Sequence, residues 1–349
     1  MTIVDSSRPV TGGVDTHLDT HTAAVVDDLG GELGIGVFPA DGAGYASLVE
    51  WMGAFGPLCR VGVEGTGSYG AGLARYLAAG GVEVVEVDRP NRQARHRAGK
   101  SDPTDALAAA RAAVSGQAAG RAKSGDGPIE AMRVTLVARR STRSHRIELI
   151  GQIRHLTVTA PESLRERLRD LSTIMVIKTA AAMRPRATGD IAADTCARTI
   201  IELARRARQL TVEAKTLDAR LTELVGDVAP GLLARPGIGP NAAAILLVAA
   251  GDNPQRIRSE SAWAHLCGAA PIPASSGKTI RYRLNRGGNR QANHALWRIA
   301  LWRMGADERT RRYVDRRLAE GKTKREIMRC LKTYIARETY KLLPFEKLT

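Results

Sequence analysis

Residues 12–26 have the sequence Gly-Gly-Val-Asp-Thr-His-Leu-Asp-Thr-His-Thr-Ala-Ala-Val-Val, and this stretch decides the fold of the first part of the chain. Its richness in Val and Ala predicts a β-strand. The next five residues, 27–31, are Asp-Asp-Leu-Gly-Gly and predict a turn, and residues 32–38 form a second extended stretch. We therefore predict a β-hairpin here.

Helices and strands alternate after this hairpin. The pattern predicts a helix at 45–52, a strand at 60–63, a helix at 71–79 and a strand at 82–87. A further alanine-rich helix begins after Ser101, which is an N-cap candidate followed by an early proline. Strands that alternate with helices indicate an α/β domain, which we assign to residues 1–128.

The chain is predicted to be helical beyond a glycine-rich linker at 124–128. We divide this part into a helical or coiled-coil region at 129–225, a mainly α domain at 226–318 and a basic C-terminal helix at 319–349. Apolar residues spaced four and three apart form one seam over three heptads: Leu203, Ala207, Leu210, Ala214, Leu217, Leu221 and Leu224. The seam fits a coiled coil between subunits and an antiparallel helix pair within one chain equally well.

A hairpin of proline and glycine separates two apolar segments in the third region. Residues 232–240 have the sequence Leu-Leu-Ala-Arg-Pro-Gly-Ile-Gly-Pro and lead directly into an apolar helix at 241–250. This is the helix-hairpin-helix pattern, in which Gly237 and Gly239 let backbone N–H groups approach a DNA phosphate. The alternative is an ordinary turn between helices. The tryptophans that we expect to fill the core of this domain are Trp263, Trp297 and Trp302.

The composition describes a folded and basic chain of 349 residues. Lys and Arg number 52 against 36 Asp and Glu, and the resulting net charge of +16 favours a nucleic-acid partner. The charge is unevenly placed: residues 1–128 carry −4, residues 129–280 carry +8 and residues 281–349 carry +12. The acidic first domain therefore needs an explanation of its own.

Several classes of protein are excluded. The longest apolar run, 242–250, is about half of the roughly 20 residues that span a bilayer, and the first ten residues have no apolar signal core. The four cysteines lie far apart without a CxxC pair, which argues against a zinc ribbon and a disulfide framework. Aromatic residues make up only 4%, too few for extensive base stacking. We expect a cytoplasmic protein of a bacterium or archaeon, associated with the nucleoid and not with a membrane.

Four acidic residues are candidates for a metal site. Asp15 lies in the first strand, Glu64 ends a later strand, and Asp102 and Asp105 project to one side of a helix start. Each acid alone has a structural explanation, but their order along the chain is that of RNase H-like nucleases. Two Mg²⁺ ions, with Mn²⁺ as an alternative, would neutralise such a cluster and activate phosphodiester chemistry. The histidines that we expect to make packing or polar contacts only are His17, His265 and His294.

A serine loop in the C-terminal region is a second candidate. Residues 267–278 have the sequence Cys-Gly-Ala-Ala-Pro-Ile-Pro-Ala-Ser-Ser-Gly-Lys, and several arginines follow. Guanidinium groups around a serine would suit attack on a phosphate. On chemistry alone such a loop is more often a solvated turn.

Taken together, these motifs resemble the insertion sequence 110 family of DEDD transposases. The resemblance rests on the four acids, the hairpin at 236–239, and the stretch from Gly268-x-x-Pro through Ser-Gly to Arg-Gly-Gly-Asn-Arg at 286–290, so it spans nearly the whole chain. It implies an RNase H-like domain, similar to RuvC, that binds Mg²⁺ through the four acids. It also implies a transposase domain with a nucleophilic serine, which by motif position is Ser276 and not the adjacent Ser275.

The resemblance further implies a reaction and a set of partners. The serine would attack DNA, form a phosphoserine link and free a 3′-OH. Family members act as oligomers, here a dimer or tetramer, on donor and target DNA that pair with an element-encoded bridge RNA. The residues expected to bind nucleic acid are Gly237, Gly239, Lys278, Arg281, Arg283, Arg286, Asn289 and Arg290.

Three other interpretations remain open at this point. A junction resolvase or nuclease would use the four acids and water without the serine. A DNA-binding protein without activity would use the hairpin and the basic C-terminal segment alone. An actin-like ATPase also opens with an aspartate in a hairpin, but no second phosphate loop is evident in the sequence.

Overall fold

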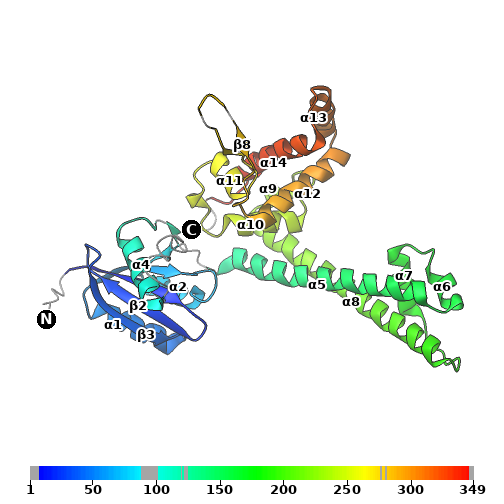
Figure 1. Ribbon diagram of the computed structural model, residues 1–349, viewed down its shortest axis with the longest axis horizontal. Helices are drawn as coiled ribbons and strands as arrows, with labels where there is room; N and C mark the ends of the chain where they lie inside the picture. The colour runs from blue at the N-terminus through cyan, green and yellow to red at the C-terminus, as the bar shows by residue number, and fades with distance from the viewer. Residues whose placement is uncertain are drawn as a thin grey trace. The chain divides into compact units, whose positions relative to one another are not determined.

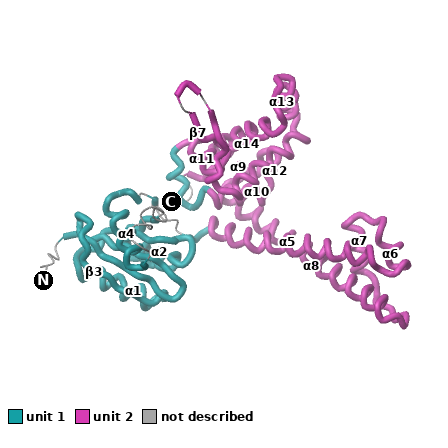
Figure 2. The backbone as a smooth tube through the Cα atoms, viewed as in Figure 1, with its two compact units in different colours: residues 1–127, 250–258, 348–349 teal, residues 128–249, 259–347 magenta. Residues whose placement is uncertain are grey.

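The computed structural model describes residues 8–87, 101–118, 120–121, 125–275, 277–279 and 281–345. The chain divides into two compact units (Figure 2). Unit 1 consists of residues 1–127, 250–258 and 348–349, and unit 2 of residues 128–249 and 259–347. An α/β first part followed by a mainly helical remainder agrees with the prediction.

Unit 1 is built on a six-stranded mixed sheet with the strand order β3-β2-β1-β4-β5-β6 (Figure 1). The central strands β1, β4 and β5 run parallel, whereas β2 is antiparallel to β1 and β3, and β6 is antiparallel to β5. The strands are β1 (Val10–Thr16), β2 (Thr20–Val26), β3 (Glu32–Pro39), β4 (Leu58–Glu64), β5 (Glu83–Val87) and β6 (Gly120–Arg121).

The predicted single strand over residues 12–26 is wrong. It is two strands, β1 and β2, joined by a turn in which the N–H of His17 donates to the carbonyl of Thr20 at 3.1 Å. This turn has the sequence His-Leu-Asp and holds no glycine or proline to mark it. The predicted turn at 27–31 is confirmed, and its Gly30 has a φ of +84°.

Helices cover both faces of the sheet. They are α1 (Gly42–Gly53), α2 (Ala71–Ala79) and α4 (Asp102–Val114). A Cβ on Gly12 would meet Met52 of α1, whereas a Cβ on Gly13 would meet the backbone of Ala110 in α4. Because successive residues of a strand point to opposite faces, α1 and α4 lie on opposite faces of the sheet. Helix α2 shares the core with α1, since Leu73, Leu77, Leu48 and Met52 belong to one buried cluster.

Unit 2 begins with a long antiparallel helix pair. Its helices are α5 (Gly127–Thr159), α6 (Glu162–Leu168), α7 (Thr173–Ala182) and α8 (Ile191–Val228). Arg139, Thr142 and Arg146 of α5 bind Asp218, Glu213 and Thr211 of α8 in that order. The partner numbers fall along α8 as they rise along α5, so the two helices run antiparallel (Figure 1).

The apolar seam on α8 is used within the chain. Ala207 and Leu221 are fully buried, and the other five seam residues are half-buried. Ala207 packs in a cluster with Ile153 of α5, Val176 of α7 and Ile200 of α8. Of the two alternatives that the seam left open, the intramolecular helix pair is therefore present.

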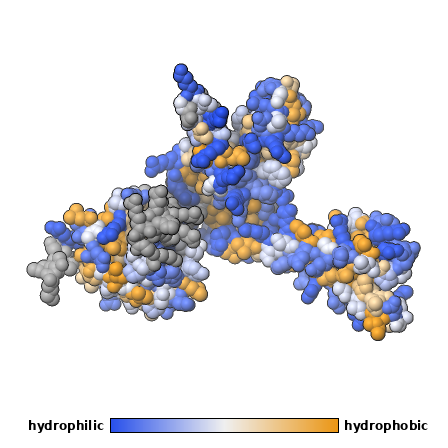
Figure 3. Space-filling model, in the orientation of Figure 1, coloured by the Kyte–Doolittle hydropathy of each residue, from blue (hydrophilic) through white to orange (hydrophobic). Residues whose placement is uncertain are grey.

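The rest of unit 2 is a group of shorter helices with one small β-hairpin. The elements are α9 (Pro230–Leu233), α10 (Pro240–Ala250), α11 (Glu260–Leu266), β7 (Ile272–Pro273), β8 (Tyr282–Arg283), α12 (Arg290–Ala306), α13 (Glu308–Ala319) and α14 (Lys324–Tyr340). The β7/β8 hairpin projects from this group, and its tip is hydrophilic (Figure 3). The group also includes the helix, hairpin and helix order that the sequence predicts at 232–250.

Only one of the three tryptophans predicted to fill the core does so. Trp263 is fully buried, and its indole N–H donates to Thr339 at 3.1 Å. Trp297 and Trp302 are 39% and 50% exposed, so the prediction is wrong for both. They lie on the outward side of α12, whereas Leu296 and Ile299 of the same helix face the core.

Two exclusions made from the sequence can be compared with the structure. The four cysteines, all within the described part of the chain, are free thiols. No helix in the described ranges combines the length and the apolar character needed to cross a membrane.

Candidate functional site

The register of the sheet places two of the predicted acids side by side. Val14 of β1 pairs with Val63 of β4 in parallel register, so Asp15 and Glu64 are the next residues on adjacent strands. Both follow a glycine by two positions, Gly13 and Gly62, and therefore point to the face that α4 covers. Asp15 is buried and Glu64 is half-buried.

Glycines bring α4 unusually close to this face. A Cβ on Gly13 would lie 2.1 Å from the backbone nitrogen of Ala110, and a Cβ on Gly62 would lie 2.6 Å from the carbonyl of Ala109. Only a residue without a side chain allows the helix backbone to approach the strands at these distances. The two glycines thus set the distance between the strand acids and the helix.

The start of α4 supplies the other two acids. Ser101 is the N-cap, as predicted, and its hydroxyl accepts from the N–H of Thr104. Asp102 and Asp105 both lie in the first turn, where the helix dipole favours negative charge. Asp105 is buried, whereas the Asp102 side chain is 48% exposed.

His17 lies between the two groups of acids. Its Nε2 atom is 3.3 Å from a carboxylate oxygen of Asp15 and 3.3 Å from one of Asp102. These three residues each offer one ligand atom, and the three atoms lie within 4.8 Å of one another. The expectation that His17 makes only packing or polar contacts overlooked this position. Its spacing from Asp15 was a signal, because residues two apart along a strand point to the same face of the sheet.

Among the described residues, three carboxylates and one imidazole influence one another at this site. Burial raises the pKa of the Asp15 carboxyl above its ordinary value of 3.8, and His17 opposes this increase. The negative charges of Asp102 and Asp105 raise the pKa of Asp15 further. A bound cation would favour the ionised form of Asp15, because an opposite charge nearby stabilises a carboxylate.

These residues fit a divalent metal ion. Carboxylate oxygens are the ligands that Mg²⁺ and Mn²⁺ prefer, and an imidazole nitrogen suits Mn²⁺ better than Mg²⁺. One ligand atom from each of Asp15, His17 and Asp102 lies within 4.8 Å of the other two. Divalent metal binding at this edge of the sheet is therefore chemically consistent with the residues present.

The serine loop belongs to unit 2 and connects β7 to β8. Ser276, the serine expected to be the nucleophile, lies outside the described residues. The Ser275 hydroxyl accepts from the N–H of Arg281 at 3.1 Å and lies 3.4 Å from the carbonyl of the same residue. Ser275 thus closes the base of the loop by hydrogen bonds across it.

The glycine motifs on either side of this loop meet in space. A Cβ on Gly288 would lie 2.4 Å from the backbone of Gly268, so the two segments touch through their backbones. The amide of Asn293 donates to the carbonyls of Cys267 and Gly268 at 3.0 and 2.8 Å. The Asn289 side chain caps α12 by accepting from two backbone N–H groups, so its oxygen has a structural role.

The residues predicted to bind nucleic acid fall into two places. Gly237, Gly239 and Arg290 line one groove in unit 2. Lys278, Arg281, Arg283 and Arg286 are exposed on the β7/β8 hairpin and the loop after it. The sequence did not indicate that arginines of α5 line the same groove as Arg290, because α5 is more than a hundred residues away along the chain.

A carboxylate cluster on a mixed sheet, with a basic helical unit that carries a glycine hairpin, is typical of proteins that process nucleic acids. A family model described as Transposase matches residues 12–160, and a model described as Transposase IS116/IS110/IS902 family matches residues 230–315. The chain belongs to the IS110 family of transposases.

A relative from Streptomyces coelicolor agrees with this assignment. It is described as an insertion element IS110 uncharacterized 43.6 kDa protein and is 38% identical over 117 residues. The match covers 32% of this chain and 28% of the relative, so the chain aligns with under a third of that protein's length.

Proposed function

We propose that the chain is a DNA transposase that cuts and rejoins phosphodiester bonds. The observation that carries this proposal is the convergence of Asp15, His17 and Asp102, with Asp105 beside them, on the α4 face of the sheet. The strand order supports an RNase H-like domain, similar to RuvC, for unit 1. Family membership supports DNA as the substrate.

The acids are proposed to hold Mg²⁺ or Mn²⁺, with two ions at the site. Asp15 and Asp102 are the first ligands in this proposal, and Glu64 and Asp105 complete the set. Bound divalent ions supply charge neutralisation and activation in phosphodiester chemistry. The residues of the chain fix the position of the carboxylates through β1, β4 and the start of α4.

Ser276 is proposed to be the nucleophile. Its hydroxyl oxygen forms a bond to phosphorus, the bond from phosphorus to the 3′ oxygen breaks, and the 3′ oxygen takes a proton and leaves as a 3′-OH. This stores the phosphodiester energy for rejoining. The hydrogen bonds of Ser275 to Arg281 support this choice, because they engage the neighbouring hydroxyl in the structure of the loop.

Guide RNA and self-association belong to the same proposal. A structured RNA that pairs with donor and target DNA would leave the protein to hold backbones, in keeping with its basic surface. A dimer or tetramer would let subunits exchange strands. The middle seam residues Leu210, Ala214 and Leu217 stay half-buried in the chain and offer a partly exposed apolar strip for such contacts.

The test is a denaturing gel that detects a covalent adduct between protein and DNA. The element's junction DNA and its flanking RNA are incubated with Mg²⁺ and the wild type, Ser275→Ala, Ser276→Ala or Asp102→Ala. We expect an adduct with the wild type and Ser275→Ala, and none with Ser276→Ala or Asp102→Ala.

The same gel separates the proposal from a metal-dependent nuclease that uses water. Strand cleavage without an adduct, unchanged in Ser276→Ala and lost in Asp102→Ala, would establish the nuclease and exclude serine attack. Full activity of Asp102→Ala would exclude any role of the acids in the reaction.

A further inference from the structure

A basic groove lies in unit 2 where α5, α10 and α12 meet. Its volume is about 700 Å³. Its lining comes mainly from α5, the start of α10 and α12, with Asp218 contributed by α8. The charged and imidazole side chains that line it are Arg139, Arg140, Arg143, Asp218, Arg290, His294 and Arg298.

The basic residues form two rows along the groove. Arg290, His294 and Arg298 are four residues apart, so they follow one ridge of α12. Arg139 and Arg143 have the same spacing on α5. The row on α12 is about 12 Å long, a length over which one strand of a duplex presents about three phosphates.

Most of this charge has no compensating acid. Asp218 is the single acidic residue in the lining, and it is bound to Arg139. Arg140 contacts the neutral side chain of Gln291. Within the described ranges, no ion pair involves Arg143, Arg290 or Arg298, and all three are exposed. A groove with five arginines and one acid attracts an extended anion.

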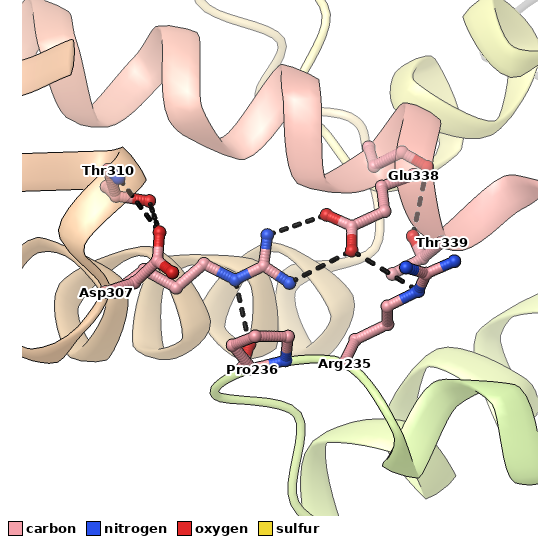
Figure 4. A network of polar contacts seen from close by, with 8 residues as sticks. Arg235, Pro236, Asp307, Thr310, Glu338 and Thr339 are labelled. Carbon is pink, nitrogen blue, oxygen red and sulfur yellow. Dashed lines mark hydrogen bonds and ion pairs between the residues drawn. The ribbon is translucent and has the colours of Figure 1, made fainter. Parts of the chain in front are cut away.

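The hairpin that leads into α10, part of the groove lining, is held in place before any ligand binds. The Arg303 guanidinium donates to the carbonyl of Pro236 at 2.8 Å and also binds Glu338, which lies 3.7 Å from Arg235 (Figure 4). Gly237 has a φ of +76°, and a Cβ there would lie 2.8 Å from Trp302. The hairpin that leads into α10 is thus fixed on both sides, and the groove keeps its shape.

From these observations we infer that this groove binds the phosphodiester backbone of a nucleic acid duplex through arginines of α5 and α12. Among the described residues that line the groove, Trp302 is the single indole or phenyl ring, so stacking on bases contributes little and contacts with phosphates carry the binding. DNA and RNA share this chemistry. The inference rests on the proposed nucleic-acid substrate but not on the proposed serine or metal chemistry.

The test measures binding of the full-length chain to DNA and RNA duplexes of one sequence, without Mg²⁺. The groove variant carries Arg143→Gln, Arg290→Gln and Arg298→Gln. The control variant loses the same charge at exposed positions of α8, outside the groove, through Arg206→Gln, Arg208→Gln and Arg220→Gln. Fluorescence anisotropy at several salt concentrations gives Kd and the slope of log K against log salt for each protein.

We expect the slope of log K against log salt to become shallower by about 2 to 3 in the groove variant. Each of the three lost phosphate contacts contributes about 0.9 to this slope. At low salt its Kd should rise at least tenfold, and the control variant should change much less. Replacing the same three arginines by lysine should keep most of the slope, which shows that the effect comes from charge and not from misfolding. Weaker binding of the groove variant to DNA alone, to RNA alone or to both supports a nucleic-acid site in the groove and identifies which nucleic acid it binds.

Two results would overturn the inference. One is a groove variant with the wild-type slope and Kd on both duplexes. The other is a control variant that loses as much as the groove variant, because binding would then depend on net charge alone. Neither result depends on catalysis, so failure of the serine mechanism is recognised separately by the adduct gel.

Discussion

The two units treat charged groups in opposite ways. In unit 1, Asp15 is buried beside two further carboxylates, and the basic side chain that contacts it among the described residues is the imidazole of His17. In unit 2, Glu338 is half-buried but lies between the guanidinium groups of Arg303 and Arg235. Among the described contacts, Asp15 therefore has one basic neighbour, whereas Glu338 has two.

The different surroundings of Asp15 and Glu338 indicate different roles, a ligand site for Asp15 and a structural contact for Glu338. A buried carboxylate that is only partly compensated lowers the free energy of unfolding, so a cation bound beside it would stabilise the fold. A buried charge with full partners fixes the packing of helices and needs no ligand. Neutralising each acid should therefore give opposite results in the two units.

The largest expected effect is that of Asp15→Asn on strand cleavage. Loss of one preorganised charged group from an active site lowers the rate by roughly a thousandfold, and the covalent gel assay measures this. The same change should raise Tm by a few degrees without metal. Burial and neighbouring acids raise the pKa of Asp15 in the folded state, so ionising it costs stability as the pH rises from about 4 towards 7.

Without metal, Asp15→Asn should be more stable than the wild type, and Mg²⁺ should reverse this order. The wild type should gain Tm with increasing Mg²⁺ because the ion binds the folded state alone, and Asp15→Asn should gain little. Thermal unfolding with and without Mg²⁺ at pH 5 and pH 7 measures both effects. An Asp15→Asn protein that is less stable than the metal-free wild type at pH 7 would contradict the idea that the charge of Asp15 is only partly compensated.

The next largest effect concerns the contact between sheet and helix. Gly13→Ala places a Cβ 2.1 Å from the backbone of Ala110, and we expect a loss of about 3 kcal/mol in the free energy of unfolding, since backbone cannot rearrange like a side chain. Gly53→Ala is the matched control, because a Cβ there meets nothing within 4 Å and alanine favours the α1 helix. Urea unfolding of both variants tests the difference. Equal stability of the two would show that α4 does not depend on Gly13.

Much of unit 1 could be predicted because its signals are local. The N-cap at Ser101, the bounds of the helix at 71–79 and the turn at 27–31 each follow from a few adjacent residues. The order of the acids along the chain also sufficed to select them as a set. What could not be predicted is the short turn after His17, since its residues carry no turn signal, and with it the position of the imidazole between two carboxylates.

Unit 2 was less predictable because its contacts join distant segments. The seam on α8 indicated a helix partner but not which one, and polar pairs with α5 such as Thr142 to Glu213 decide it. Trp302 has the large aromatic side chain that is typical of core residues, yet it is half exposed and lies beside Gly237. The arginines of the basic groove also come from helices far apart in sequence, and no local pattern brings them together.

A moderate effect is expected where unit 2 compensates its acid. Glu338→Gln leaves the nearly buried Arg303 without its carboxylate, and we expect a loss of about 2 kcal/mol because the pair is only partly buried. Asp170→Asn breaks the exposed contact with Arg169 and should cost less than about 0.5 kcal/mol. Chemical denaturation measures both values. A Glu338→Gln protein as stable as Asp170→Asn would remove the contrast between the two units.

A smaller effect than that of Glu338→Gln is expected for Asp307, a half-buried acid of unit 2 that caps a helix. Asp307 caps α13 by accepting from the N–H and hydroxyl of Thr310, and these hydrogen bonds lower the pKa of its carboxyl below 3.8. Asp307→Ala should cost about 1 kcal/mol at pH 7. Because the folded-state pKa is lowered, this contribution is complete above about pH 5 and disappears as the pH falls through the folded-state value. Stability curves of wild type and variant should therefore converge in acid, in contrast to Asp15→Asn, whose curve separates from the wild type as the pH rises.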